Sequence, residues 1–174
     1  KFDASSDLYF TGGNIAIKLD KLDDANKYFI KAIELDNKNM NYRNAQENLL
    51  SLKNDITSAR KTFDSGRLDE AINDYLELSS KYPNNAIVFY NLGRMYKVDK
   101  QYDNAVKYYK IAAKTNPFED KYKLAIKAIA QQVAKEGDTE YRRQEFDVAI
   151  SNYKESINYF PDFTIAYFKL ARTY

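Results

Sequence analysis

A short motif recurs four times along this chain and restricts the folds that the chain can adopt. The motif is a bulky apolar residue, Asp, any residue and then Ala, with an aromatic residue four positions after the Ala. Asn or Pro follows twelve positions after the same Ala. The four copies begin at Leu22, Leu68, Tyr102 and Phe146. Fixed spacing of this kind is typical of repeat proteins, in which each repeat forms one supersecondary unit.

The third copy lies in a stretch that alternates small and large residues regularly. Residues 89–117 place aromatic, Leu, Gly, Tyr, Ala, aromatic, Ala and Pro at eight positions, which are Phe89, Leu92, Gly93, Tyr96, Ala105, Tyr109, Ala112 and Pro117. This order resembles the tetratricopeptide repeat family, whose unit is a helix-turn-helix of 34 residues. Residues 6–39 match it more loosely, through Tyr9, Gly13, Ala25, Phe29 and Ala32.

The resemblance implies an all-α fold, a right-handed α-solenoid of helix-turn-helix repeats. We expect one domain over residues 1–174, with units at 6–39, 40–85, 86–119 and 120–163 and a partial fifth unit at 164–174. The small residues would let two helices approach closely, while the bulky residues fill the space beside them. The Asp before each second helix would cap it or lie in its first turn, and Pro would end the unit.

Two of the junctions between units are longer than the family pattern requires. The Ala residues of successive copies are 46, 34 and 44 residues apart, so residues 40–51 and 120–129 are insertions, and neither contains Gly or Pro. The simplest interpretation is that each insertion lengthens the first helix of its unit, giving helices near 40–64 and 119–142. Separate helices remain an alternative, because Gly137 could end the second of these.

Both expected long helices carry an apolar stripe at heptad-like spacing. The first contains Tyr42, Ala45, Leu49, Leu52, Ile56, Ala59 and Phe63, and the second contains Tyr122, Ile126, Ile129 and Val133. Packing within the solenoid is the preferred interpretation of these seams, and self-assembly into a homodimer or oligomer is the alternative. The tail at 164–174 begins a further unit without its second helix, which suggests a fragment of a longer protein.

Composition excludes several classes of function. The 174 residues include no Cys and no His, so thiol or imidazole catalysis and zinc binding by these side chains are excluded. With 27 basic and 25 acidic residues, the net charge of +2 is too small to indicate a general nucleic-acid binder. We expect no enzyme activity, no cofactor and no metal, and no apolar run long enough for a membrane span. The cellular compartment is not indicated.

The resemblance implies that function lies in a concave groove lined by the first helices, which holds a peptide or helix of a partner protein. The residues expected to face this groove are Phe10, Asn14, Ile17, Arg60, Phe63, Tyr90, Arg94, Lys97, Tyr141, Arg142, Phe168 and Arg172. An aromatic residue and a polar residue four positions later recur in this set at intervals of about 80 residues. Such aromatics are either binding anchors or partly buried walls of the groove.

Two other kinds of ligand are less favoured by the residues present. One subclass of the family binds acidic chaperone tails through Lys, Asn and Arg, but of the corresponding positions here, Phe10, Asn14, Thr57, Ile87 and Asn91, only Asn14 fits. We therefore do not expect the chaperone tail as partner. A helical-repeat RNA binder would need a basic stripe with stacking aromatics, and the acidic residues nearly cancel the basic ones.

Overall fold

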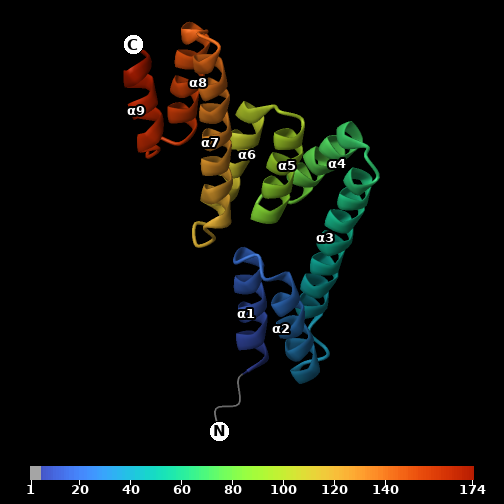
Figure 1. Ribbon diagram of the computed structural model, residues 1–174. Helices are drawn as coiled ribbons and strands as arrows, with labels where there is room; N and C mark the ends of the chain where they lie inside the picture. Colours follow the sequence, from blue (N-terminus) through green and yellow to red (C-terminus); the bar gives the residue numbers. More distant parts are fainter. Residues whose placement is uncertain (1–4) are drawn as a thin grey trace.

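The computed structural model describes residues 5–174, and within this range the chain consists of nine helices and no strand (Figure 1). Successive helices form antiparallel pairs that stack side by side into a helical-repeat solenoid, and the last helix has no second member (Figure 1). The helices are α1 (Ser6–Lys18), α2 (Leu22–Leu35), α3 (Met40–Asp64), α4 (Leu68–Lys81), α5 (Ala86–Val98), α6 (Tyr102–Thr115), α7 (Lys121–Arg142), α8 (Phe146–Tyr159) and α9 (Thr164–Thr173).

Each helix pair is joined by a tight turn that contains one residue in the left-handed region. These residues are Asp20, Gly66, Lys100 and Gln144, with φ between 59° and 80°. The amide that follows each of them bonds back to a carbonyl of the preceding helix, as Lys21 N does to Ala16 O at 2.8 Å. This is the C-terminal cap in which one left-handed residue satisfies the last helical carbonyls.

The Asp residues of the recurring motif lie in the first turns of the second helices, as one of the two expected arrangements has it. Asp23, Asp69, Asp103 and Asp147 are all first-turn residues. The capping positions themselves carry Lys21, Arg67, Gln101 and Glu145, and none of them makes a side-chain cap bond. The carboxylates therefore act on the helix dipole rather than as hydrogen-bonding caps.

The interior is built from the expected contacts between small and large residues. Ala25, Ala71, Ala105 and Ala149 are completely buried where the two helices of a pair meet. At Gly93, a Cβ atom would lie 2.7 Å from the ring of Tyr109, so that position has no room for a side chain. The alternation in the sequence is thus a packing pattern.

The two long first helices are each continuous, with 25 residues in α3 and 22 in α7. Helix α7 runs through Gly137, where the ring of Tyr153 occupies the space that a side chain would need. The preferred interpretation of the insertions is therefore confirmed. The four-residue seam of α7 is entirely buried, and no residue of the α3 seam is fully exposed.

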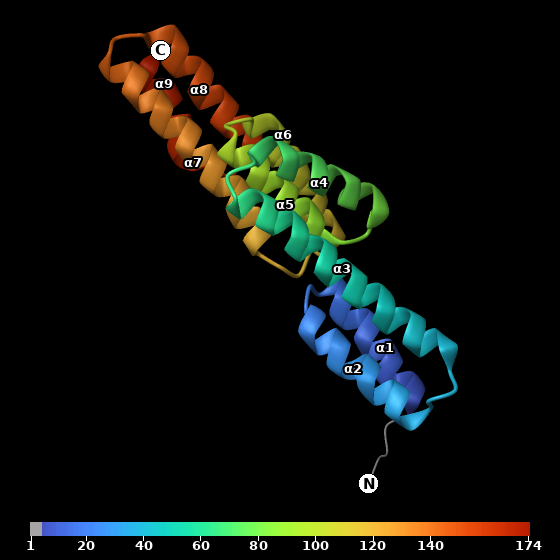
Figure 2. The same ribbon diagram turned by 90° about the vertical axis from the view of Figure 1, so that its right-hand side faces the viewer.

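The length of α3 places the first helix pair at one end of an elongated molecule. Figure 2 shows α1 and α2 beside the N-terminal part of α3, with α4 to α9 continuing from its other end. The turn between α1 and α2 consequently reaches the loop between α6 and α7 (Figure 1). This contact joins segments about 100 residues apart in sequence and was not predicted.

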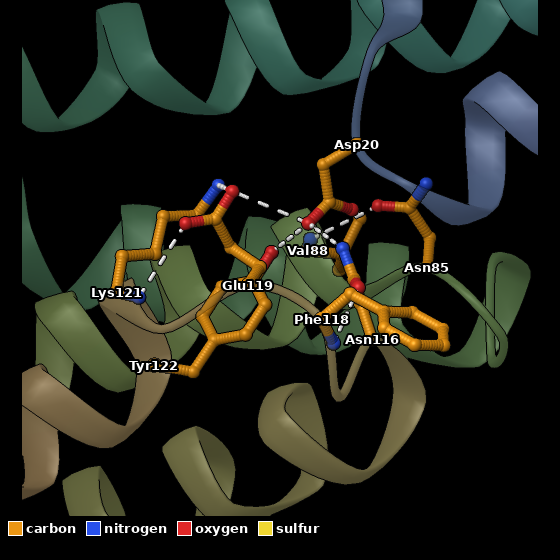
Figure 3. Close-up of polar contacts among 8 residues, drawn as sticks. All are labelled: Asp20, Asn85, Val88, Asn116, Phe118, Glu119, Lys121 and Tyr122. Atoms are coloured by element: carbon orange, nitrogen blue, oxygen red, sulfur yellow. Dashed lines mark hydrogen bonds and ion pairs between the residues drawn. The ribbon is translucent and has the colours of Figure 1, made fainter.

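A buried polar cluster forms the contact between these two segments (Figure 3). The Asp20 side chain is only 3% exposed, and its Oδ2 accepts hydrogen bonds from Asn116 Nδ2 at 2.8 Å and from the Tyr122 hydroxyl. Lys121 Nζ lies 3.8 Å from the same oxygen. A carboxylate this deeply buried requires such donors to offset its lost hydration.

Candidate functional site

The first helices of successive units enclose two clefts. The first, here called the basic cleft, lies between α5 and α7 and has a volume of about 580 Å³. It is lined by Tyr90, Arg94, Lys97, Val98, Tyr109, Lys121, Leu124 and Ala125. Arg94 and Lys97 are one helical turn apart on α5, so both side chains reach the same cleft. Three cations and no carboxylate line it.

Two of the residues that line the basic cleft, Tyr90 and Tyr109, are tyrosines whose rings lie close together. The ring centroid of Tyr90 lies 5.5 Å from that of Tyr109 and 5.3 Å from that of Tyr122. The Lys121 ammonium lies 5.8 Å from the centroid of the Tyr90 ring. Burial raises the pKa of the Tyr109 hydroxyl, which therefore stays protonated and neutral at ordinary pH.

The three cations of the basic cleft differ in whether their charge is compensated. Lys121 is shared between Glu119 at 3.7 Å and Asp20 at 3.8 Å. Arg94 and Lys97 are exposed and form no ion pair with any carboxylate in the part of the chain that the structure describes. Arg94 only donates to Asn91 Oδ1, at 3.4 Å. Both groups are thus free to bind an anionic group of a ligand.

The second cleft, here called the neutral cleft, lies between α1, α3 and the loop from α4 to α5, and has a volume of about 320 Å³. Its lining contains no charged residue and consists of Asn14, Ile17, Ala45, Asn48, Leu49, Leu52, Tyr82, Pro83, Asn84 and Asn85. The Tyr82 hydroxyl donates to Asp55 Oδ2 at 2.7 Å, which fixes that side of the cleft. Buried Leu49 and Leu52 supply apolar surface.

The two clefts occupy equivalent places in a repeat of 80 residues. Asn14 and Ile17 of the neutral cleft correspond in this register to Arg94 and Lys97 of the basic cleft. Ala45 and Ala125 are likewise equivalent and line the two clefts. Equivalent positions of the repeat are therefore uncharged in the neutral cleft and positively charged in the basic cleft.

Two of the three recurring aromatic residues, Phe10 and Tyr90, pack against rings of neighbouring helices. Phe10 packs against Phe29 at 5.8 Å and Tyr42 at 5.0 Å between ring centroids, as Tyr90 packs against Tyr109 and Tyr122. Both Phe10 and Tyr90 are half-buried by these contacts. The polar residues four positions later, Asn14 and Arg94, are exposed instead.

The other groove residues expected from sequence lie outside both clefts. Arg60 is exposed and lies 3.7 Å from Asp64, and Phe63 packs into the core formed by α3, α4 and α5. Near the C-terminus, the Arg172 guanidinium lies 5.0 Å from the centroid of the Tyr141 ring. Arg142 is exposed and donates to Thr139, and Phe168 is 66% exposed on α9. The residues expected to face one groove therefore lie in separate patches.

Several cleft residues were not predicted from the sequence. Lys121 and Leu124 reach the basic cleft from the start of α7, inside the insertion that precedes the recurring motif. Asn84 and Asn85 reach the neutral cleft from the loop between α4 and α5, to which the repeat pattern assigns no role beyond ending one unit. One signal in the sequence could have placed Lys121, namely the repeat of 80 residues. In that repeat Tyr122 is equivalent to Tyr42, and Lys121 is its neighbour in the chain.

Residues 5–174 contain no helix with the length and apolar character that crossing a bilayer requires. Within that same range, no cluster of three or more potential metal-binding side chains occurs.

Two family models described as tetratricopeptide repeat match the chain, at residues 6–39 and 57–120. Among solved structures, the TPR domain of P58(IPK) is similar over 97% of this chain with a TM-score of 0.58 and 13% identity. The chain spans 45% of the length of that domain. MamA (19% identity, TM-score 0.36, covering 93% of this chain and 82% of MamA) and a repeat protein of Parabacteroides merdae (20%, 0.35, 97% and 57%) are more distant. A search of curated proteins found no match.

Proposed function

The chain belongs to the tetratricopeptide repeat family, and from this premise we propose that it binds a peptide or helix of a partner protein in the two clefts beside its first helices. Repeats of this family are protein-interaction modules and are typically not catalytic. The proposal assigns the interaction to the first helices, between α1 and α3 and between α5 and α7.

One observation carries the proposal, which is the pair of uncompensated cations in the basic cleft. Arg94 and Lys97 are exposed beside the half-buried ring of Tyr90. Arg and Tyr side chains dominate the binding energy of protein interfaces, and a guanidinium can bind a carboxylate through two parallel hydrogen bonds. The basic cleft therefore suits an acidic side chain of the partner.

Self-assembly through the seams of the long helices receives no comparable support. Tyr42 and Ala59 of α3, and Ile129 and Val133 of α7, are buried against helices of the same chain. Their apolar area is thus already covered, and a second copy would gain little by approaching them.

The proposal is tested by selecting peptides from a random displayed library on the purified protein. Binding of a selected, fluorescently labelled peptide is then measured by anisotropy for the wild type, Arg94→Ala and Lys97→Ala. We expect Arg94→Ala to weaken binding by about tenfold or more, because a hydrogen bond to a charged group is lost. Binding should also weaken as salt is raised, because the cleft is open to solvent.

Lys110→Ala is the matched control for Lys97→Ala. Lys110 is exposed on α6, outside both clefts, so its removal makes the same change in net charge without altering the proposed site. Equal affinity of the selected peptides for the wild type and for Arg94→Ala would contradict the assignment of the site. A separate anisotropy titration with labelled single-stranded RNA is the second test, and RNA binding with the same dependence on Arg94, in the absence of any selected peptide, would contradict the assigned class of partner.

A further inference from the structure

The neutral cleft contains a buried hydrogen-bond donor without a partner. Asn85 is 5% exposed, and its Oδ1 caps α5 by accepting from the Val88 amide at 3.2 Å. Because the Val88 amide needs an acceptor, the orientation of the Asn85 side chain is fixed. Its Nδ2 is buried and makes no hydrogen bond with any described residue.

The unpartnered nitrogen of Asn85 is directed away from the polar cluster of Asp20. In Figure 3 this nitrogen points away from Asp20, and Lys121 is on the opposite side of Asp20 from Asn85. Asn85 belongs to the lining of the neutral cleft. A buried donor costs free energy unless it is paired, so a ligand that supplies an acceptor here would remove that cost.

The remaining walls of the neutral cleft favour an uncharged group. Leu49 and Leu52 are buried beneath it, while Asn14 and Asn48 are exposed at its edge. The volume of about 320 Å³ is at the small end of the range for ligand sites and accommodates one branched aliphatic side chain. A charged group would lose hydration here and find no opposite charge.

Comparison of the two clefts further restricts the chemical class of ligand that the neutral cleft can bind. The positions that carry Arg94 and Lys97 in the basic cleft carry Asn14 and Ile17 in the neutral cleft. We propose that the neutral cleft binds an uncharged, extended stretch of a partner peptide, with a branched aliphatic side chain between Ile17 and Leu52. The main-chain carbonyl next to that side chain accepts a hydrogen bond from Asn85 Nδ2.

This inference rests on the proposed function and specifies which part of the partner each cleft receives. The neutral cleft takes the aliphatic residue, and the basic cleft takes acidic residues of the same segment. The order of these residues in the partner, and not only its overall charge, then determines how it lies across the repeats.

The experiment uses ¹⁵N-labelled protein and two small probes that imitate single peptide residues. N-acetyl-leucine N-methylamide should shift the Asn85 side-chain amide resonances saturably, with a dissociation constant on the order of 1 mM for a ligand of this size. This binding should not change between low and high salt, because no charge takes part. N-acetyl-glutamate N-methylamide should instead shift the Arg94 guanidinium resonances, and more weakly at high salt.

Asn85→Ser removes the donor while keeping a residue that caps a helix equally well. It should weaken binding of the leucine probe by about tenfold, as expected for one lost hydrogen bond in a buried site. Asn39→Ser is the control, because Asn39 caps α3 with the same side chain and does not line the cleft. This control variant should bind the leucine probe as the wild type does.

A second variant changes the charge of the cleft without touching buried residues. Asn14→Arg gives the neutral cleft the cation that the basic cleft has at the equivalent position, Arg94. Because Asn14 is exposed, the substitution should not disturb the core. This variant should bind the leucine probe less well and acquire binding of the glutamate probe.

The two probes separate failure of this inference from failure of the proposed function. Absence of any saturable shift with the leucine probe at tens of millimolar, or equal binding by Asn85→Ser, would overturn the role of the neutral cleft. The basic cleft would still be supported if the glutamate probe bound at Arg94. If the leucine probe bound but the glutamate probe did not shift the Arg94 resonances, the proposed role of the basic cleft would be overturned and that of the neutral cleft would be retained.

Discussion

Gly12 in α1 and Gly93 in α5 differ in how much space surrounds the position where a side chain would begin. At Gly93 a Cβ atom would lie 2.7 Å from the Tyr109 ring and 3.1 Å from the Ala105 carbonyl oxygen. At Gly12 the same atom would lie 3.6 Å from the ring of Tyr28, which is an ordinary contact. Close packing therefore requires glycine at position 93 and does not require it at position 12.

We expect Gly93→Ala to lower the free energy of unfolding by about 1–3 kcal/mol, because the added methyl group overpacks the contact between α5 and α6. Gly12→Ala should raise it by up to about 1 kcal/mol, because alanine favours a helix interior over glycine. Urea unfolding followed by circular dichroism measures both changes. If the two substitutions had the same effect, the assigned repeat register would be contradicted.

At the scale of the element, α9 is held to the rest of the chain by a small set of contacts. Ala166 is its one buried residue, and Lys169 forms an ion pair with Asp138 of α7. Asp138 Oδ1 also accepts from the Tyr153 hydroxyl at 2.8 Å. Burial by itself would raise the pKa of Asp138, but Lys169 and Tyr153 outweigh it and hold the pKa below its ordinary value of 3.8.

The lowered pKa of Asp138 predicts how attachment of α9 depends on pH. Because the folded state binds this proton less readily than the unfolded state, the contact stabilises fully above pH about 4 and is lost as pH falls through the folded pKa. Asp138→Asn should therefore speed amide hydrogen exchange in residues 164–173 at neutral pH. Acidification of the wild type should likewise lower the protection factors of these amides, which compare their exchange rates with the slower intrinsic exchange of an unstructured chain at the same pH.

Asp74→Asn serves as the control for Asp138→Asn. Asp74 lies on α4, far along the chain from α9, and the described part of the structure gives it no ion pair. This variant should leave exchange in α9 unchanged. Equal exchange rates for Asp138→Asn and the wild type would show that α9 is held by its apolar contacts alone.

Helices were far easier to predict from the sequence than clefts. The spacing of Ala105, Tyr109 and Pro117 indicates α6 because small and large residues must alternate wherever two helices pack. The continuity of α3 follows from the absence of Gly and Pro between 40 and 64. Arg94 and Lys97 could be placed in a cleft because they share one face of one helix. Asn85 could not, because its position depends on how one unit meets the next, which no periodic pattern records.

At the scale of the whole molecule, the contact between Asp20 and the loop from α6 to α7 joins units that are not neighbours in the chain. Asn116 and Tyr122 are completely or almost completely buried around it. Burial and the hydrogen bond to Asp20 raise the pKa of the Tyr122 hydroxyl, which stays protonated and continues to donate. The first helix pair is thereby fixed against the middle of the solenoid, beside the neutral cleft.

The strength of this contact can be measured because the 80-residue register supplies a matched position. Asp20 and Lys100 both adopt left-handed φ, 61° and 59°, in equivalent turns, but only the Asp20 side chain is buried. Lys100→Gly should raise the free energy of unfolding by about 1 kcal/mol, because glycine adopts this conformation without steric cost. Asp20→Gly gains the same turn energy but leaves the Asn116 amide and the Tyr122 hydroxyl unpaired, each costing about 1–3 kcal/mol.

We therefore expect Asp20→Gly to be net destabilising and Lys100→Gly to be stabilising, although both make the same change to equivalent turns. Asp20→Gly should also increase the radius of gyration in small-angle X-ray scattering, because the first helix pair then pivots on α3 with only local contacts to hold it. Tyr122→Phe, which keeps the ring and removes the hydroxyl, should reproduce part of the loss. Equal stability and equal scattering for the two glycine variants would show that stacking of adjacent units alone determines the shape of the solenoid.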